Sequence, residues 1–133
     1  MSPEDLQRNL ATVRAQLLAS SQPQQPPVTL IAVSKTRPPE QLRAAHQCGQ
    51  KDFGENYVQE AVPKITALSD LDIVWHFIGP IQKNKTRSIA EHFDWVHSID
   101  RAVIAERHDQ QRPDQLPVLN ECLQINLNEE DTK

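Results

Sequence analysis

Lys35 is the residue of this sequence whose type and position could support covalent chemistry. It follows an apolar run at positions 28–33, and a run that is apolar on both faces predicts a buried parallel strand. Parallel α/β sheets bind ligands at the carboxyl ends of their strands, so this strand would present the Lys35 amine there. An amine partly removed from water is a nucleophile toward aldehydes, which makes imine chemistry available. The alternative is a strand-end lysine that simply extends into solvent.

Polar residues also accompany the next two apolar segments. Asn56 follows the segment 53–55 and could either cap the next helix or contact a ligand. His76 lies inside the segment 73–79, where a histidine is either a hydrogen-bonded core residue or a group that lines the interior beside a ligand ring. Three basic residues near the following helix start could hold an anion or form a solvated basic face: Lys83, Lys85 and Arg87.

Other common kinds of site are not indicated by the sequence. There is no GxGxxG or Walker loop for a nucleotide and no GxSxG elbow for a serine nucleophile. The histidines show no HxxxH or HxH pairing, so no metal site is predicted. Cys48 and Cys122 are isolated, which favours two free thiols in a reducing compartment.

The composition bounds the class of protein. The length of 133 residues suits one domain with a real core. The 14 basic and 18 acidic side chains give a net charge of −4, which argues against a general binder of nucleic acid or membrane surfaces. No apolar run is long enough to span a bilayer and no signal pattern begins the chain, so we expect a cytoplasmic protein.

The elements that must position Lys35 begin with an N-terminal helix. Ser2 is its expected N-cap. Its apolar stripe recurs at helical spacing: Leu6, Leu10, Val13 and Leu17. The proline-rich segment 22–27 cannot continue a helix, so residues 1–27 form a helix and a polar Pro/Gln connector.

From position 28 onward, strand-like and helix-like segments alternate at a spacing of roughly 21 to 24 residues, which is typical of βα units with a parallel sheet. The expected strands are 30–34, 53–55, 73–79, 95–99 and 119–126. The expected helices are 39–48, 57–68, 83–92 and 101–111, with a kink or a restart at Pro63. An open doubly wound sheet and a (β/α)8 barrel both fit this pattern. A barrel needs eight strands, so residues 28–133 would then be the first five strands of a single incomplete domain in a longer protein.

Three ordered motifs carry a specific resemblance. They are Ala-Val-Ser-Lys-Thr at 32–36, Phe-Gly-Glu-Asn-Tyr-Val-Gln-Glu at 53–60 and Trp-His-Phe-Ile-Gly-Pro-Ile-Gln-Lys-Asn-Lys at 75–85. With the later segments 92–101 and 123–126, they resemble the pyridoxal phosphate homeostasis protein family, also called the YggS or PROSC family. The resemblance covers nearly all of the chain from Val28 onward.

The resemblance implies a TIM-type (β/α)8 barrel like the N-terminal domain of bacterial alanine racemase, of which about five βα units are present here. It also implies that pyridoxal 5′-phosphate (PLP) is held as a Schiff base on Lys35. Asn56 and His76 match motif positions on the cofactor side of the barrel. The family's later strands, which hold the cofactor phosphate, have no counterpart in this sequence.

The implied function is non-catalytic PLP binding in intracellular PLP homeostasis, with PLP-dependent apoenzymes as possible recipients. The protein would need neither nucleic acid nor membrane, and the parent protein would be monomeric, although this chain could self-associate. Two alternatives remain open. One is a PLP-dependent amino-acid racemase or lyase, and the other is a truncated fragment that does not bind PLP independently.

Overall fold

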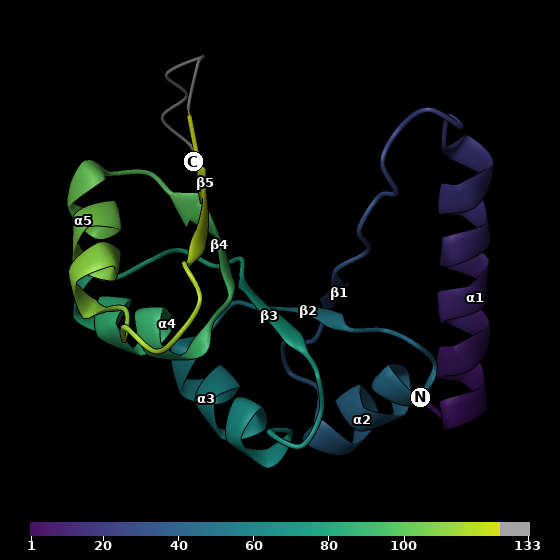
Figure 1. Ribbon diagram of the computed structural model, residues 1–133. Coiled ribbons are helices and arrows are strands. Elements are labelled where there is room, and N and C mark those ends of the chain that lie inside the picture. The colour runs from purple at the N-terminus through teal and green to yellow at the C-terminus, as the bar shows by residue number, and fades with distance from the viewer. Residues whose placement is uncertain (126–133) are drawn as a thin grey trace, which may run out of the picture.

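The computed structural model describes residues 1–125, which form a five-stranded parallel sheet with helices that connect and flank it (Figure 1). The strands are β1 (Ala32–Val33), β2 (Asp52–Glu55), β3 (Val74–Phe77), β4 (Trp95–Ile99) and β5 (Asn120–Leu123). The helices are α1 (Pro3–Ser20), α2 (Pro39–Gln47), α3 (Val58–Ala67), α4 (Thr86–His92) and α5 (Ala102–Gln111), with a 3-10 turn, η1 (Lys83–Lys85), before α4.

The strands lie in the sheet in the same order as in the sequence, β1-β2-β3-β4-β5. Every connection therefore moves one strand further in the same direction. Crossovers of one hand then place their helices on one face of the sheet. Figure 1 shows α2 to α5 in a row along one side of it. A doubly wound sheet reverses its strand order at a switch point, so the described strands exclude that alternative.

The strand register defines which residues share a face of the sheet. Val33 pairs with Gly54, Gly54 with His76, and His76 with Trp95. Because side chains alternate along a strand, this row lies on the face opposite the one that carries Phe53, Trp75 and Phe77. We call the face of the row Val33, Gly54, His76 and Trp95 the helix-free face.

The hydrophobic core lies between the other face of the sheet and the helices. Phe77 of β3 contacts Phe93, which follows α4, edge to face with ring centroids 5.3 Å apart. Ile89 of α4 and Ile104 of α5 are completely buried in the same core. This packing of one sheet face against the helices stabilises the parallel strands.

Helix α1 begins as the sequence predicts. The Ser2 side chain accepts a hydrogen bond from the Asp5 amide at 3.1 Å. The helix packs on α2, and Leu10 is its buried residue. The predicted apolar stripe is wrong at Val13, which is exposed. Arg14 connects α1 to the start of β2 instead, because its guanidinium donates to the Cys48 carbonyl at 2.9 Å and to Gln50 at 2.6 Å.

The element boundaries agree with the prediction to within a few residues, and those of β4 agree at both ends. The predicted fifth strand reaches Asn126, which lies outside the described residues. The expected burial of both faces of the first strand is wrong, because Val28 and Val33 are more than half exposed. The helices that the structure describes cover only one side of β1.

The sequence predicts a kink or a restart at Pro63, and the structure has no restart there. Helix α3 is a single helix of 10 residues with Pro63 inside it. The bond that proline cannot make is the one to the Gln59 carbonyl. Gln59 and Pro63 are both exposed, so water can satisfy that carbonyl and the helix continues.

Among residues 1–125, no helix combines the length and apolar character needed to cross a bilayer. The same residues contain no cluster of three or more histidine, cysteine or acidic side chains placed to hold a metal ion. Cys48 and Cys122 are half-buried free thiols.

Candidate functional site

Lys35 lies just beyond β1, at the carboxyl edge of the sheet. The ladder continues one residue past the strand, since the Ser34 amide donates to the Gly54 carbonyl at 2.9 Å. Ser34 is buried on the helix-covered side, and alternation then places Lys35 on the helix-free face, where its side chain is exposed. The same alternation places Asn56 after β2 and His97 in β4 in the same row as Lys35. The predicted amine is therefore at the carboxyl edge of the sheet.

A tight turn carries Lys35. The Arg37 amide donates to the Ser34 carbonyl at 3.1 Å, which closes the turn around Lys35 and Thr36. Thr36 has a φ of 65°, a left-handed conformation that is rare for a β-branched residue and costs free energy. Such outliers persist only where surrounding contacts hold them.

Those contacts come from an ionic cluster, which comprises the buried Lys64 and Glu55 and the partly exposed Glu60. The Lys64 ammonium donates to the Ser34 carbonyl at 2.7 Å, to Glu60 at 2.7 Å and to both oxygens of Glu55 at 3.1 and 3.2 Å. Glu60 also accepts a hydrogen bond from the Thr36 amide, and Glu55 accepts one from the Ser34 hydroxyl. The hydrogen bond from Lys64 lowers the pKa of Glu60. The cluster thus joins α3 and β2 to the backbone on both sides of Lys35.

Asn56 does not cap the following helix, so that interpretation is wrong. Helix α3 has Tyr57 at its N-cap position and no side-chain cap. The Asn56 amide oxygen is buried and accepts no hydrogen bond from the described residues. A buried amide oxygen without a donor is costly, so this atom is available to a donor from a bound group.

Gly79 brings the end of β3 against Asn56. A Cβ atom at Gly79 would lie 2.3 Å from the Asn56 carbonyl oxygen, a distance that no side chain tolerates. Ser98 of β4 donates from its hydroxyl to the Gly79 carbonyl at 2.5 Å. The close approach at Gly79 therefore fixes the carboxyl ends of β2, β3 and β4 next to one another.

His76 lies on the helix-free face, in the row that precedes the row of Lys35 by two residues along the strands. Its Nε2 atom lies 2.8 Å from Asp52, and its Nδ1 atom lies 2.9 Å from Nε2 of His97. The Trp95 ring stacks on it, with centroids 5.9 Å apart and planes 14° from parallel. Desolvation by burial, followed by the charge of His76, lowers the pKa of His97. His76 is thus a buried histidine whose two ring nitrogens both have partners.

The basic residues predicted near the start of the fourth helix do not line the surface cavity described next. Lys83 lies in the short turn η1, and both Lys83 and Arg87 are exposed. A solvated basic face describes them better than an anion site.

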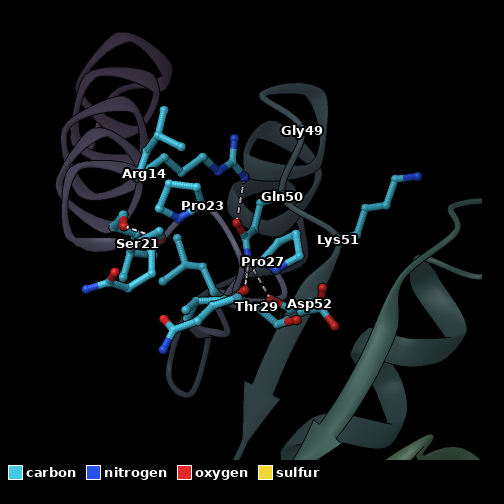
Figure 2. Close-up of a pocket in the computed structure, with 15 residues that line it drawn as sticks. Arg14, Ser21, Pro23, Pro27, Thr29, Gly49, Gln50, Lys51 and Asp52 are labelled. Atoms are coloured by element: carbon cyan, nitrogen blue, oxygen red, sulfur yellow. Dashed lines mark hydrogen bonds between the residues drawn. The ribbon is translucent and has the colours of Figure 1, made fainter.

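A surface cavity of about 700 Å³ lies at the opposite end of the sheet from Lys35 (Figure 2). It opens between the end of α1, the proline-rich loop and the residues that lead into β2. Figure 2 shows the bonds of Gln50 that close one side of it, including the one from Arg14. Lys35 does not line this cavity.

Comparison with known proteins identifies relatives of the chain. No family model matches it. It is 55% identical to the pyridoxal phosphate homeostasis protein of Pseudomonas aeruginosa, over 94% of this chain and 56% of the relative. It is 48% identical to the protein of the same name from Escherichia coli, over 97% of this chain and 58% of the relative. By sequence, nearly the whole chain is similar to pyridoxal phosphate homeostasis proteins. It spans little more than half the length of these relatives.

Solved structures show the same similarity. The structure of PipY from Synechococcus elongatus without PLP superposes with a TM-score of 0.82 and 43% identity, over 96% of this chain and 57% of PipY. The PipY structure with PLP bound gives a TM-score of 0.68 and 44% identity, over 80% of this chain and 47% of PipY.

In this homologue of the pyridoxal phosphate homeostasis proteins, the sequence did not predict the roles of several side chains that lie around Lys35. One signal was available for Lys64, which falls three residues after the buried Ala61 and four before the buried Leu68 of the α3 segment. A lysine on the apolar face of a helix indicates a buried partner. The roles of Asp52 and His97 leave no such trace, because they depend on strand register.

Proposed function

We propose that this protein binds PLP through Lys35 and serves PLP homeostasis without catalysing a reaction of its own. The observation that carries the proposal is the position of Lys35, exposed at the carboxyl edge of β1. It lies in the same row as the Asn56 amide oxygen, which has no hydrogen-bond partner among residues 1–125. The names of the relatives and the PLP-bound structure of PipY support it.

The residues present fit the cofactor. PLP supplies an aldehyde, which condenses with a neutral primary amine to give a C=N bond and one water molecule. Lys35 provides the amine at an exposed position, so an aldehyde can reach it. Asn56 provides a buried acceptor for a donor of the bound group. We assign His76 a supporting role in the floor of the site, since Asp52 and His97 occupy both of its ring nitrogens.

We also propose that the five strands belong to a (β/α)8 barrel of the alanine racemase N-terminal type, with residues 28–133 as an incomplete domain after the helix and connector of 1–27. The unidirectional strand order supports this, because a barrel is built by repeating one βα step around a closed circle. A site at the carboxyl edge of the strands is where barrel enzymes and binding proteins place their ligands.

An amino-acid racemase or lyase is the second candidate. Racemisation needs an acid/base group on each face of the substrate. Lys35 could serve one face, but the single tyrosine, Tyr57, precedes α3 and is more than half exposed. We therefore favour a carrier of PLP that delivers the cofactor to apoenzymes in the cytoplasm, where free thiols such as Cys48 and Cys122 persist.

The test is direct. PLP is added to the chain, the absorption band of the Schiff base is recorded near the visible edge, and borohydride reduction is followed by peptide mass mapping. We expect the band and the adduct on Lys35, and the loss of both in Lys35→Ala. Lys83→Ala, at an exposed lysine, is the matched control and should keep them.

Three results would revise the proposal. A band that survives Lys35→Ala would exclude Lys35 as the attachment residue. No band in the unmodified chain would favour a fragment that does not bind PLP by itself. Reproducible racemisation or decarboxylation of amino acids would exclude the non-catalytic role.

A further inference from the structure

The turn that holds Lys35 is strained at its next residue. Thr36 has a φ of 65°, a conformation that is unfavourable for a β-branched residue but not for glycine. The strain lies at an exposed turn, so burial of the Thr36 side chain does not offset it. Something else must hold this conformation.

The contacts that hold it are made to main-chain atoms on either side of Lys35. Glu60 accepts the hydrogen bond from the Thr36 amide, and Lys64 donates to the Ser34 carbonyl at 2.7 Å. Glu60 and Lys64 are one helical turn apart on α3 and bind each other at 2.7 Å. A single helix thus holds both ends of the residue that carries the amine.

The centre of the cluster is shielded from solvent and fully hydrogen-bonded. The Lys64 side chain is 6% exposed and that of Glu55 is fully buried. The Lys64 ammonium has oxygen partners from Ser34, Glu55 and Glu60, so all three of its donors are used. The ammonium that pairs with the two carboxylates therefore also fixes the Ser34 carbonyl, next to Lys35.

We propose that Glu60 and Lys64 are positioning residues, which keep the turn at Thr36 in its left-handed conformation and so aim the Lys35 amine along the helix-free face. The inference rests on the proposed attachment of PLP to Lys35. Neither residue needs to touch the cofactor.

The first experiment needs no PLP. Amide hydrogen exchange is measured by NMR in the unmodified chain, in Glu60→Leu, which removes the acceptor, and in Glu60→Gln, which keeps an acceptor oxygen. We expect exchange at Thr36 and Arg37 to rise about tenfold in Glu60→Leu and to change little in Glu60→Gln. Exchange in β3 should stay unchanged. Glu106→Leu, an exposed substitution on α5, is the control. Unchanged exchange at Thr36 and Arg37 in Glu60→Leu would overturn the proposal.

The second experiment measures the share of Lys35 that carries PLP after borohydride reduction at a fixed, subsaturating PLP concentration. We expect Glu60→Leu to lower the apparent affinity about tenfold. Thr36→Gly should restore it in the double variant, because glycine adopts a positive φ without support. A merely stabilising role for Glu60 would not be rescued in this way.

A third variant tests the proposal independently, in case the Glu60→Leu chain does not fold. Thr36→Pro fixes φ near −65° and removes the amide donor, but leaves the cluster intact. We expect it to lose PLP while Thr36→Gly keeps it. Equal PLP binding by the two Thr36 variants would overturn the positioning role. If the unmodified chain binds no PLP, the proposed function fails, and the exchange experiment still decides whether Glu60 holds the turn.

Discussion

The Nδ1 atom of His76 lies 2.9 Å from the Nε2 atom of His97, so one nitrogen donates a hydrogen and the other accepts it. The other nitrogen of His76 lies 2.8 Å from Asp52. The three side chains come from β2, β3 and β4 and form a diagonal line that rises toward the edge where Lys35 lies. Both ring nitrogens of the buried His76 are therefore engaged, and a proton gained or lost at His97 changes one of the two hydrogen bonds of this ring.

The first prediction concerns the pH dependence of folding. Burial, followed by the charge of His76, lowers the pKa of His97 below that of a histidine in the unfolded chain. The unfolded state then binds the proton at a higher pH, so this contribution to stability is complete above about pH 6.5 and is lost as the pH falls below it. The loss stops once His97 is protonated in the folded protein.

Urea unfolding at a series of pH values between about 5 and 8 checks this. We expect His97→Gln to flatten the fall in stability on the acidic side. The difference between the two proteins at about pH 8, where histidines are neutral, gives the separate cost of the lost hydrogen bond. An unchanged acidic slope in the variant would show that another group dominates.

The second prediction concerns Gly79. Gly79→Ala would place a Cβ atom 2.3 Å from the Asn56 carbonyl oxygen, so the ends of β2 and β3 must separate. We expect a loss of about 3 kcal/mol in the free energy of unfolding. Gly49→Ala is the comparison, since its Cβ would meet nothing closer than 3.4 Å and its cost, about 1–2 kcal/mol, comes from its φ of 94°. The reverse order of the two losses in denaturant unfolding would contradict the close approach at Gly79.

The sequence predicts the local features of this fold well because they depend on short-range patterns. The bounds of β4, the capping by Ser2 and the placement of Lys35 at a strand end follow from apolar periodicity and from the preferences of serine and proline. Lys35 could be recognised because its strand and its motif are contiguous in the sequence.

The contacts around Lys35 could not be predicted in the same way. Lys64 is 30 residues from Ser34 in sequence, and its burial depends on a helix that packs beside β1 and β2. The pairing of His76 with His97 requires the register of β3 on β4, and a shift of one residue would send His97 to the other face. Such contacts are fixed by tertiary structure, and a sequence pattern does not encode them locally.

The third prediction concerns the buried pair of Lys64 and Glu55. Lys64→Met leaves two carboxylates without their ammonium, one of them fully buried. We expect a loss of about 3–5 kcal/mol in the free energy of unfolding. The double variant Lys64→Met with Glu55→Leu should recover part of it, because an apolar pair replaces the buried charges. A loss below about 1 kcal/mol in Lys64→Met would mean that the pair is solvated in solution.

The fourth prediction separates stability from ligand binding at Asn56. Its amide oxygen has no hydrogen-bond partner among the described residues, so the fold gains nothing from that polar atom. Asn56→Leu keeps the branching of the side chain and removes an unsatisfied group, which is close to neutral for stability, within about 1 kcal/mol. A bound group that donates to this oxygen would lose one hydrogen bond, so we expect PLP affinity to fall about tenfold.

Thermal unfolding without PLP and a PLP titration of the same sample measure the two effects separately. Asn84→Leu, an exposed substitution before α4, controls for the added apolar surface and should change neither quantity. A large loss of stability in Asn56→Leu would mean that the amide has a structural partner. An unchanged PLP affinity would remove Asn56 from the binding site and leave Lys35 as its remaining anchor. The opposite pattern, a stable chain with weakened PLP binding, is what a polar atom held ready for a ligand requires.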